Sequence, residues 1–333
     1  MIVRDKQDLR KCVKQSVRRA PVTETAACLS VFSGGYGVEN WLNMNAEHEK
    51  EHELSLQKRF ESAGFGSPFS SPCCELLAAL DALNLPTHDL DKAETIIHGH
   101  DSASYLSQVL GALRTRRILA VTDGEMEDEV CFEDERVKPL LTVQTDTFIP
   151  GRYGVDYAGH AQRLEQRVQR IGARDIVLDR FDADALCYCV IPVCEDTGSV
   201  LHIHLESLEQ WQAFQDLLSA HPELKVLMSA DEAIESALLP KMEVRKNLLL
   251  CIGNAANLPV ALERLGIWFV PFASRAKTPE ELLGKWIRAK EHIWQSLSDA
   301  YLPLARTGYE LTREQIEADA ELLLGGNLEK FYL

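Results

Sequence analysis

The sequence lacks any long hydrophobic run. It contains nothing close to the roughly 18 consecutive apolar residues of a membrane-spanning helix. Its charged start is not followed by the roughly 7–15-residue apolar core of a secretory signal. We therefore expect a protein without a membrane span, located in the cytoplasm. In that compartment the nine cysteines are expected to be reduced thiols, mostly buried.

Positive charge is scarce as well. The chain has 35 lysines and arginines against 51 aspartates and glutamates, a formal net charge of −16. Such a surface repels phosphate backbones, so we expect no nucleic-acid partner. Basic residues do gather at the start, but Leu9, Val13 and Val17 recur there at helical spacing. This spacing predicts an amphipathic helix rather than a basic arm.

Several signatures of known sites are also missing. The SGGYG run at Ser33–Gly37 has neither the lysine of a P-loop nor the spacing of a dinucleotide-binding turn. No G-x-S-x-G nucleophile elbow occurs. The acidic stretch Asp123–Glu135 lacks the alternating ligands and central glycine of a calcium loop, so we interpret it as a solvated loop.

What the chain does have is an alternation of short apolar runs with helical segments. The predicted strands are Ile118–Val121, Leu140–Thr145, Ile176–Leu178, Val200–Leu205, Lys225–Met228, Leu248–Ile252 and Trp268–Phe272, with an early strand near Pro21–Leu29. The predicted helices between them include Gln162–Ile171, Leu208–Ala220 and Pro259–Leu265. About eight such units favour an α/β fold, a (β/α)8 TIM barrel, over an open sheet. We expect one domain over residues 1–333, with residues 40–115 a mostly helical insertion after the first strand.

Two histidine pairs outside the predicted strands allow a metal or a plain structural interpretation. His48 and His52 fit the H-E-x-x-H zinc pattern, but their segment is charged on nearly every side, which favours a solvated helix. His98 and His100 flank a glycine and precede Asp101, which favours a turn into a capped helix. The spacing of Cys187, Cys189 and Cys194 is not typical of a zinc site and predicts buried thiols.

A third pair, His202 and His204, lies in a convincing strand, because the histidines alternate with leucine and isoleucine. One alternating set of a barrel strand faces the interior. If the histidines form that set, His204 lies nearest the catalytic end and Glu206 follows at the mouth. The alternative, left open by the sequence, is a pair of histidines satisfied by structural hydrogen bonds.

The order of segments resembles the metal-dependent amidohydrolases, in particular their uronate-isomerase-like and nodulin/glutamine-synthetase-associated branches. The resemblance is carried by VLHIHLES, AHPELKVLMSADE, NLLLCIG and FVPFASRAKTPEELLGKWIRA, and by a closing segment with Gly325, Asn327 and Tyr332. It extends over most of the chain and is specific over residues 200–333. It implies a metal at the barrel mouth that activates water, held by H-x-H on the first strand, histidines on the fifth and sixth, and Asp on the eighth.

Most of these implied ligands are replaced. His204 occupies the fifth-strand position, but Ala26 and Cys28 stand at the first-strand histidines, Ser229 at the sixth-strand histidine and Arg275 at the eighth-strand Asp. Alanine cannot ligate a metal, serine is a weak ligand, and arginine places a permanent positive charge beside any cation. We expect no metal or one weakly bound divalent metal, zinc or manganese, at His204 and Cys28.

The resemblance implies a divergent hydrolase acting on a small polar or anionic substrate at the mouth. Arg275 would hold a carboxylate or phosphate and His204 would act as general acid or base, with His202, Glu206 and Ser229 beside the substrate. The alternatives are a non-catalytic protein that binds a ligand or partner, and a uronate-isomerase-like isomerase. An ion pair of Arg275 with Glu206 or Asp231 would be structural. Self-association is also left open, because family members often form homo-oligomers.

Overall fold

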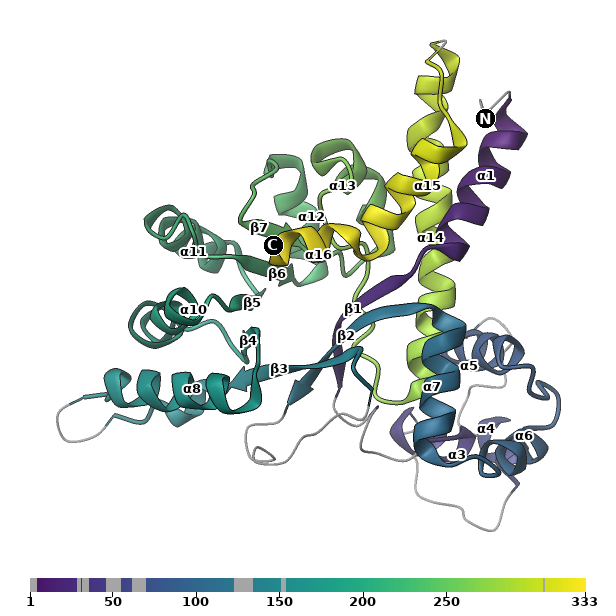
Figure 1. Cartoon of the computed structure of the whole chain (residues 1–333), viewed down its shortest axis with the longest axis horizontal. Helices are drawn as coiled ribbons and strands as arrows, with labels where there is room; N and C mark the ends of the chain where they lie inside the picture. Colours follow the sequence, from purple (N-terminus) through teal and green to yellow (C-terminus); the bar gives the residue numbers. More distant parts are fainter. Residues whose placement is uncertain are drawn as a thin grey trace.

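The core of the protein is a sheet of seven parallel strands paired in chain order. The computed structural model describes residues 5–28, 31, 36–45, 55–61, 70–122, 134–150, 154–307 and 309–333. The strands are β1 Val22–Cys28, β2 Thr115–Thr122, β3 Val137–Val143, β4 Asp175–Leu178, β5 Val200–Leu205, β6 Val226–Ala230 and β7 Leu248–Leu250. Figure 1 shows them fanned across the molecule with helices around the outside.

Helices connect and flank these strands. Ahead of β2 lie α1 Lys6–Arg19, α3 Val38–Asn45, α4 Leu56–Phe60, α5 Ser71–Ala82, α6 Leu90–Ile97 and α7 Ser102–Leu113. The crossovers hold α8 Tyr157–Ile171, α9 Ala183–Ala185, α10 Ile191–Thr197, α11 Leu208–Ala220, α12 Glu232–Leu238 and α13 Leu258–Leu265. The chain ends with α14 Pro279–Arg306, α15 Arg313–Glu321 and α16 Asn327–Tyr332.

The predicted alternation of strands and helices is confirmed. The early strand near Pro21–Leu29 is β1, the predicted Leu208–Ala220 helix is α11, and the N-terminal amphipathic helix is α1. In α1 the side chain of Asp5 caps the first turn by accepting from two backbone N–H groups, and Leu9, Val13 and Val17 are buried. The helix packs along α14, as Figure 1 also shows.

The segment between β1 and β2 is helical where it is described. Helices α3 to α7 form a group at the lower right of Figure 1, beside the long α14. The contact between α5 and α14 is very close, because a Cβ on Gly284 would lie 2.1 Å from the carbonyl oxygen of Glu75. The predicted motifs at His48–His52, most of Ser33–Gly37 and most of Asp123–Glu135 lie outside the described residues.

The predicted strand Trp268–Phe272 is reduced to one parallel bridge, between Cys251 and Val270. The N–H of Val270 donates to Leu250 at 2.8 Å, and its carbonyl accepts from Ile252 at 2.9 Å. The residues before it make local turn bonds, and Pro271 after it has no N–H to donate. The sheet that the structure describes therefore has seven strands.

The C-terminal helix α16 packs against the sheet near the amino ends of β5 and β6. Its apolar residues form a small cluster with strand residues, comprising Val200, Leu227, Leu249, Cys251, Val270, Leu328 and Phe331. Gly325 lies against β1, where a Cβ would come within 2.5 Å of the Thr23 hydroxyl, and Asn327 donates to the carbonyl of Ile267. The closing segment thus covers part of the sheet at the end away from His204. Within the described ranges, no helix is both long and apolar enough to cross a bilayer.

Candidate functional site at the mouth of the sheet

His204 lies near the end of β5, and both of its ring nitrogens have partners. Nδ1 lies 2.9 Å from the hydroxyl of Ser229 and 3.4 Å from a guanidinium nitrogen of Arg275. Nε2 lies 3.1 Å from Oδ1 of Asp231. The first contact follows from the sheet register, because His204 on β5 is the direct partner of Ser229 on β6.

These contacts determine which nitrogen of the neutral His204 ring carries the proton. A guanidinium only donates hydrogen bonds, so Nδ1 must present its lone pair to Arg275. Nε2 then carries the hydrogen and donates it to Asp231. The side chains of His204 and Asp231 are 25% and 59% exposed, so both reach solvent. An accessible imidazole supported by a carboxylate is a common arrangement for general acid–base chemistry.

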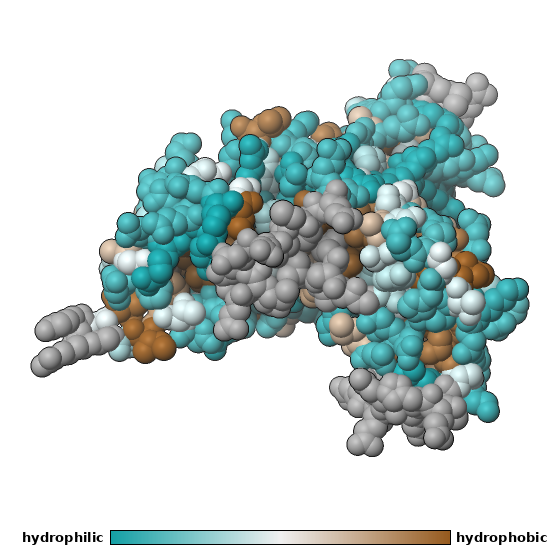
Figure 2. Space-filling view, turned by 60° about the horizontal axis from the view of Figure 1, so that its bottom comes forward, coloured by the Kyte–Doolittle hydropathy of each residue, from teal (hydrophilic) through white to brown (hydrophobic). Residues whose placement is uncertain are grey.

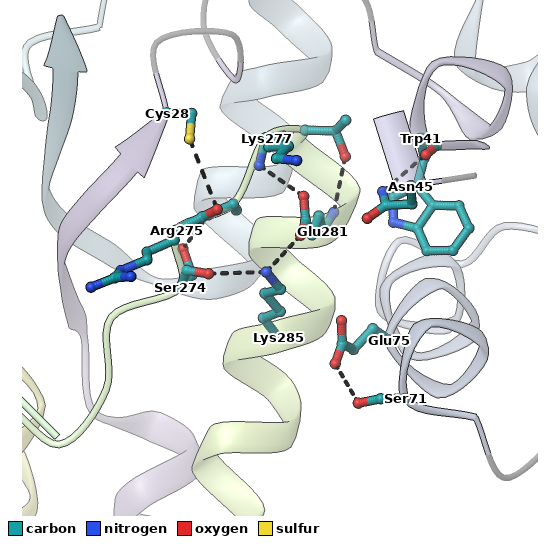
Figure 3. Close-up of polar contacts among 12 residues, drawn as sticks. Cys28, Trp41, Asn45, Ser71, Glu75, Ser274, Arg275, Lys277, Glu281 and Lys285 are labelled. Atoms are coloured by element: carbon teal, nitrogen blue, oxygen red, sulfur yellow. Dashed lines mark hydrogen bonds and ion pairs between the residues drawn. The ribbon is translucent and has the colours of Figure 1, made fainter. Parts of the chain in front are cut away.

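Arg275 occupies an unusual backbone conformation, with φ of +47°. Residues other than glycine are uncommon there, so neighbouring bonds must hold the turn. The N–H of Ser274 donates to the carboxylate of Glu24 at 3.1 Å, and Lys285 Nζ donates to the Ser274 carbonyl at 3.0 Å. Figure 3 shows the Arg275 side chain pointing away from Lys285, toward the strands. The turn therefore directs the guanidinium to the mouth.

Glu24 anchors this turn from a fully buried position on β1. Its carboxylate accepts hydrogen bonds from the N–H of Ala26 at 2.8 Å, from Ser274, and from the indole of Trp286 at 2.6 Å. Burial raises the pKa of Glu24 above its usual range, and the donated hydrogen bonds act in the opposite direction. Glu24 thus joins β1, the Arg275 turn and α14.

Cys28 ends β1 beside the same turn, with its thiol 3.9 Å from the carbonyl oxygen of Arg275 (Figure 3). Across the described ranges, no three histidine, cysteine, aspartate or glutamate side chains gather as a metal-binding group. The lone pair of His204 faces a guanidinium. These residues do not fit a tightly held divalent cation. The weak zinc or manganese site at His204 and Cys28 stays a prediction.

Neither a protein-family model nor a curated protein matches this sequence. The structure does match that of a uronate isomerase from Bacillus halodurans C-125. The two superpose with a TM-score of 0.82 over 99% of this chain and 97% of that chain, at 18% sequence identity. The chain has the fold of a uronate isomerase. The prediction from the sequence is confirmed as far as this fold, while the replaced metal positions remain an interpretation of the sequence.

Within the uronate isomerase fold of this chain, His202 lies below the mouth. Its Nε2 is 2.8 Å from Asp175, and the two side chains are only 8% and 2% exposed. The hydroxyl of Tyr332 donates to the same carboxylate, and Arg117 lies 4.6 Å over the Tyr332 ring. His202 therefore has its hydrogen bonds made within the structure, which is the structural alternative that the sequence left open. A contact of His202 with substrate stays a prediction.

Glu206 is exposed at the start of the β5–α11 connection. Its backbone N–H donates to the side chain of Gln210 at 2.6 Å. Within the described part of the chain, Arg275 forms no ion pair with Glu206 or Asp231 and contacts His204 instead. The structural ion pairs considered from the sequence are therefore absent from this arrangement.

Sequence reasoning missed the roles of three carboxylates. Asp231 was considered only as a partner of Arg275, although it follows Ser229 by two residues and so emerges at the same strand end. Asp175 is the first residue of β4, and Glu24 lies within β1. No local sequence pattern marks either carboxylate as the acceptor of several hydrogen bonds. The hydrogen bonds of Asp175 with His202 and of Glu24 with Trp286 each join residues more than 25 positions apart, so only the tertiary structure shows them.

The remaining motifs have structural explanations. Asp101 caps α7 by accepting from Ser104 N–H, which confirms the predicted turn after His100. His98 bonds Glu94 at 2.9 Å. Cys189 and Cys194 are buried and Cys187 is partly buried, and burial raises the pKa of Cys189 to about 11.

A cavity of about 310 Å³ lies behind the Arg275 turn, between α5 and α14. Its cationic residues are already engaged: Lys285 pairs with Glu281 at 2.6 Å, and Arg288 bonds Ser71 and Glu75. Because these charges are neutralised within the chain, the cavity is less suited to an anion than the mouth.

Proposed function

We propose that the protein is an amidohydrolase-like enzyme that binds a small carboxylate at the mouth and moves a proton on it. The observation that carries this proposal is the guanidinium of Arg275, 3.4 Å from Nδ1 of His204, with Asp231 on the opposite nitrogen. An anion anchor, a base and a carboxylate that supports the base are thereby adjacent.

The proposal takes the sheet to be closed as a (β/α)8 barrel over one domain of residues 1–333, with residues 40–115 inserted. Two contacts support closure. Val270 bridges to Cys251 on one side, and the N–H of Cys28 in β1 donates to the carbonyl of Ala276 at 2.9 Å on the other. Both contacts are those expected of a segment 270–276 that takes the place of an eighth strand between β7 and β1.

Substrate binding would release the base. A carboxylate accepts two parallel hydrogen bonds from a guanidinium, which is a stronger interaction than the 3.4 Å contact with an imidazole. As Arg275 turns to the substrate, the Nδ1 lone pair of His204 becomes available. It takes a proton from the carbon next to the substrate carbonyl, and Asp231 stabilises the imidazolium that forms.

Delivery of that proton to the former carbonyl carbon gives an isomer of the substrate. The hydroxyl on the deprotonated carbon gives its own proton to the former carbonyl oxygen and becomes the new carbonyl. No atom or electron is gained or lost. The substrate class that fits is a sugar acid with a carbonyl, as for the uronate isomerase whose fold the chain shares. Hydrolysis is the second candidate, but it requires an activated water, and the described residues of the mouth offer no tight metal site to activate one.

The test is incubation of the full-length protein with D-glucuronate in D2O, followed by NMR. We expect a ketose product with deuterium at the exchanging carbon. His204→Gln should abolish both signals, and Arg275→Ala should raise KM about tenfold or more. His221→Gln is the matched control, because His221 pairs with Glu195 on the surface away from the mouth.

Three other results would each contradict the proposal and indicate a different function or site. Product formed equally by the His204 and Arg275 variants would place the site elsewhere. Binding of glucuronate that depends on Arg275, without product or deuterium, would indicate a non-catalytic ligand-binding protein. Turnover of a carboxylated amide or lactone that needs both residues, without isomerisation, would indicate the hydrolase.

A further inference from the structure

A second cavity of about 310 Å³ lies between the end of β3 and α8. Its apolar wall is formed by Val143, Phe148 and Leu164, and its polar side by His160, Arg163 and Arg167. None of these is a residue of the mouth. The volume falls at the lower end of the range of pockets that hold small molecules.

The polar side of this cavity is one face of a single helix. His160, Arg163 and Arg167 are spaced by three and four residues on α8, so their side chains project in the same direction. Arg163 makes no hydrogen bond or ion pair with any residue that the structure describes. Burial, and then the charge of Arg163, lower the pKa of His160. Unlike the cavity behind the Arg275 turn, this one retains an unneutralised cation.

A series of aromatic rings leads outward from the apolar wall. The ring of Phe148 lies 4.8 Å from that of His160 and 5.6 Å from that of Tyr157. Tyr157 in turn lies 5.7 Å from Tyr188, whose side chain is among the exposed large hydrophobics at 60%. Figure 2 shows hydrophobic surface at its lower left, at the end of the molecule that α8 occupies in Figure 1. Rings of this kind stack on planar groups.

We propose that this cavity binds a small anion in which a phosphate or carboxylate group is joined to a planar ring. The guanidinium of Arg163 pairs with the oxyanion, in a cavity whose lining also includes Arg167. The ring of the ligand lies against Phe148 and the tyrosines that continue from it. This site is separate from the mouth and does not depend on the proposed reaction there.

Calorimetric titration of the full-length protein with phenyl phosphate tests the proposal. Inorganic phosphate and phenol, the two halves of this ligand, are titrated separately for comparison. Benzoate distinguishes a carboxylate from a phosphate as the anionic group. We expect phenyl phosphate to bind more tightly than either half. Arg163→Ala should weaken it at least about tenfold, the loss typical of one charged hydrogen-bonding group. Arg163 is exposed, so the substitution should leave the fold intact.

Two controls lie within the chain. Arg170→Ala removes an exposed arginine from the same helix outside the cavity lining, and Arg275→Ala removes the anion anchor of the mouth. Both should change the affinity for phenyl phosphate less than about twofold. Binding that is lost in Arg275→Ala but retained in Arg163→Ala would overturn the proposal, as would no heat at about 1 mM ligand. Inorganic phosphate that binds as tightly as phenyl phosphate would overturn the role of the aromatic wall.

Discussion

The guanidinium of Arg275 lies 3.4 Å from Nδ1 of His204, so a fixed positive charge lies directly beside the imidazole. Arginine stays protonated under all ordinary conditions. It can take over one task of a metal, the attraction of an anionic substrate, but cannot lower the pKa of a bound water by coordination. This relationship favours proton transfer over hydrolysis at the mouth.

The contacts of His204 predict its tautomer. Arg275 can only donate to Nδ1, so the neutral ring should carry its hydrogen on Nε2, facing Asp231. Nitrogen-15 NMR of the imidazoles near pH 8 checks this, with His204→Gln to assign the signal. His221 is the internal control, because its Nδ1 lies 2.8 Å from Glu195 and should carry the hydrogen instead. A ring protonated on Nδ1 at His204 would contradict the arrangement.

The close contact of α5 and α14 predicts opposite effects of two glycine-to-alanine changes. Gly284→Ala places a Cβ 2.1 Å from the backbone of Glu75, so the helices must separate, and we expect a loss of at least about 2 kcal/mol in unfolding free energy. Gly111 lies within α7 with nothing within 4 Å of an added Cβ. Gly111→Ala should therefore stabilise by about 0.5–1 kcal/mol.

Urea denaturation of both variants measures these changes. The contrast between the two sites is the critical readout, because it separates the local clash from the general helix propensity of alanine. A Gly284→Ala protein as stable as the wild type would show that α5 and α14 are not packed so closely.

The sequence was most informative where residues form a periodic pattern. The alternation of histidines with apolar residues predicted β5, and helical spacing predicted α8 and α11. It was least informative at the segment around Val270, where an apolar run resembles a strand. There, local turn bonds and Pro271 limit pairing to one bridge, and no periodicity signals such competition.

The same distinction applies to the site. His204, Ser229 and Arg275 could be proposed from the order of segments, and they lie together in the structure. The tautomer of His204 and the anchoring role of Glu24 depend on hydrogen bonds between residues far apart in the chain. Those contacts join strands and helices that are distant in the chain, and single-sequence patterns do not encode such pairings.

Lys290 predicts a pH dependence of stability. It is buried on α14, where it donates to the carbonyls of Arg18 and Ala20, and burial lowers its pKa from 10.5 to about 8. Between pH 8 and 10.5 the unfolded chain binds more protons than the folded one, so the free energy of unfolding rises with pH. The shift corresponds to about 3 kcal/mol in total.

Denaturation of the wild type and of Lys290→Met at several pH values isolates this contribution. The wild type should gain stability relative to Lys290→Met as the pH rises from 8 to 10, and below pH 8 the difference should be constant. Lys92→Met, at an exposed lysine on α6, should show no such trend. A constant difference across the whole range would contradict the burial of a charged Lys290.

A hydrogen bond between Tyr332 and Asp175 joins the C-terminal helix α16 to β4. Burial raises the pKa of Tyr332 well above its ordinary value, so its hydroxyl stays protonated and donates to Asp175, which also bonds His202. Tyr332→Phe keeps the ring beneath Arg117 and removes only this donor. We expect a loss of about 1.5–3 kcal/mol, the range for a hydrogen bond to a charged group. Tyr309→Phe, at a half-exposed tyrosine, is the control and should change stability by less than about 0.5 kcal/mol in urea denaturation. If both variants unfold at the same urea concentration, the Tyr332 hydroxyl contributes nothing to stability, and α16 is held by its other contacts, including the hydrogen bond of Asn327 to Ile267.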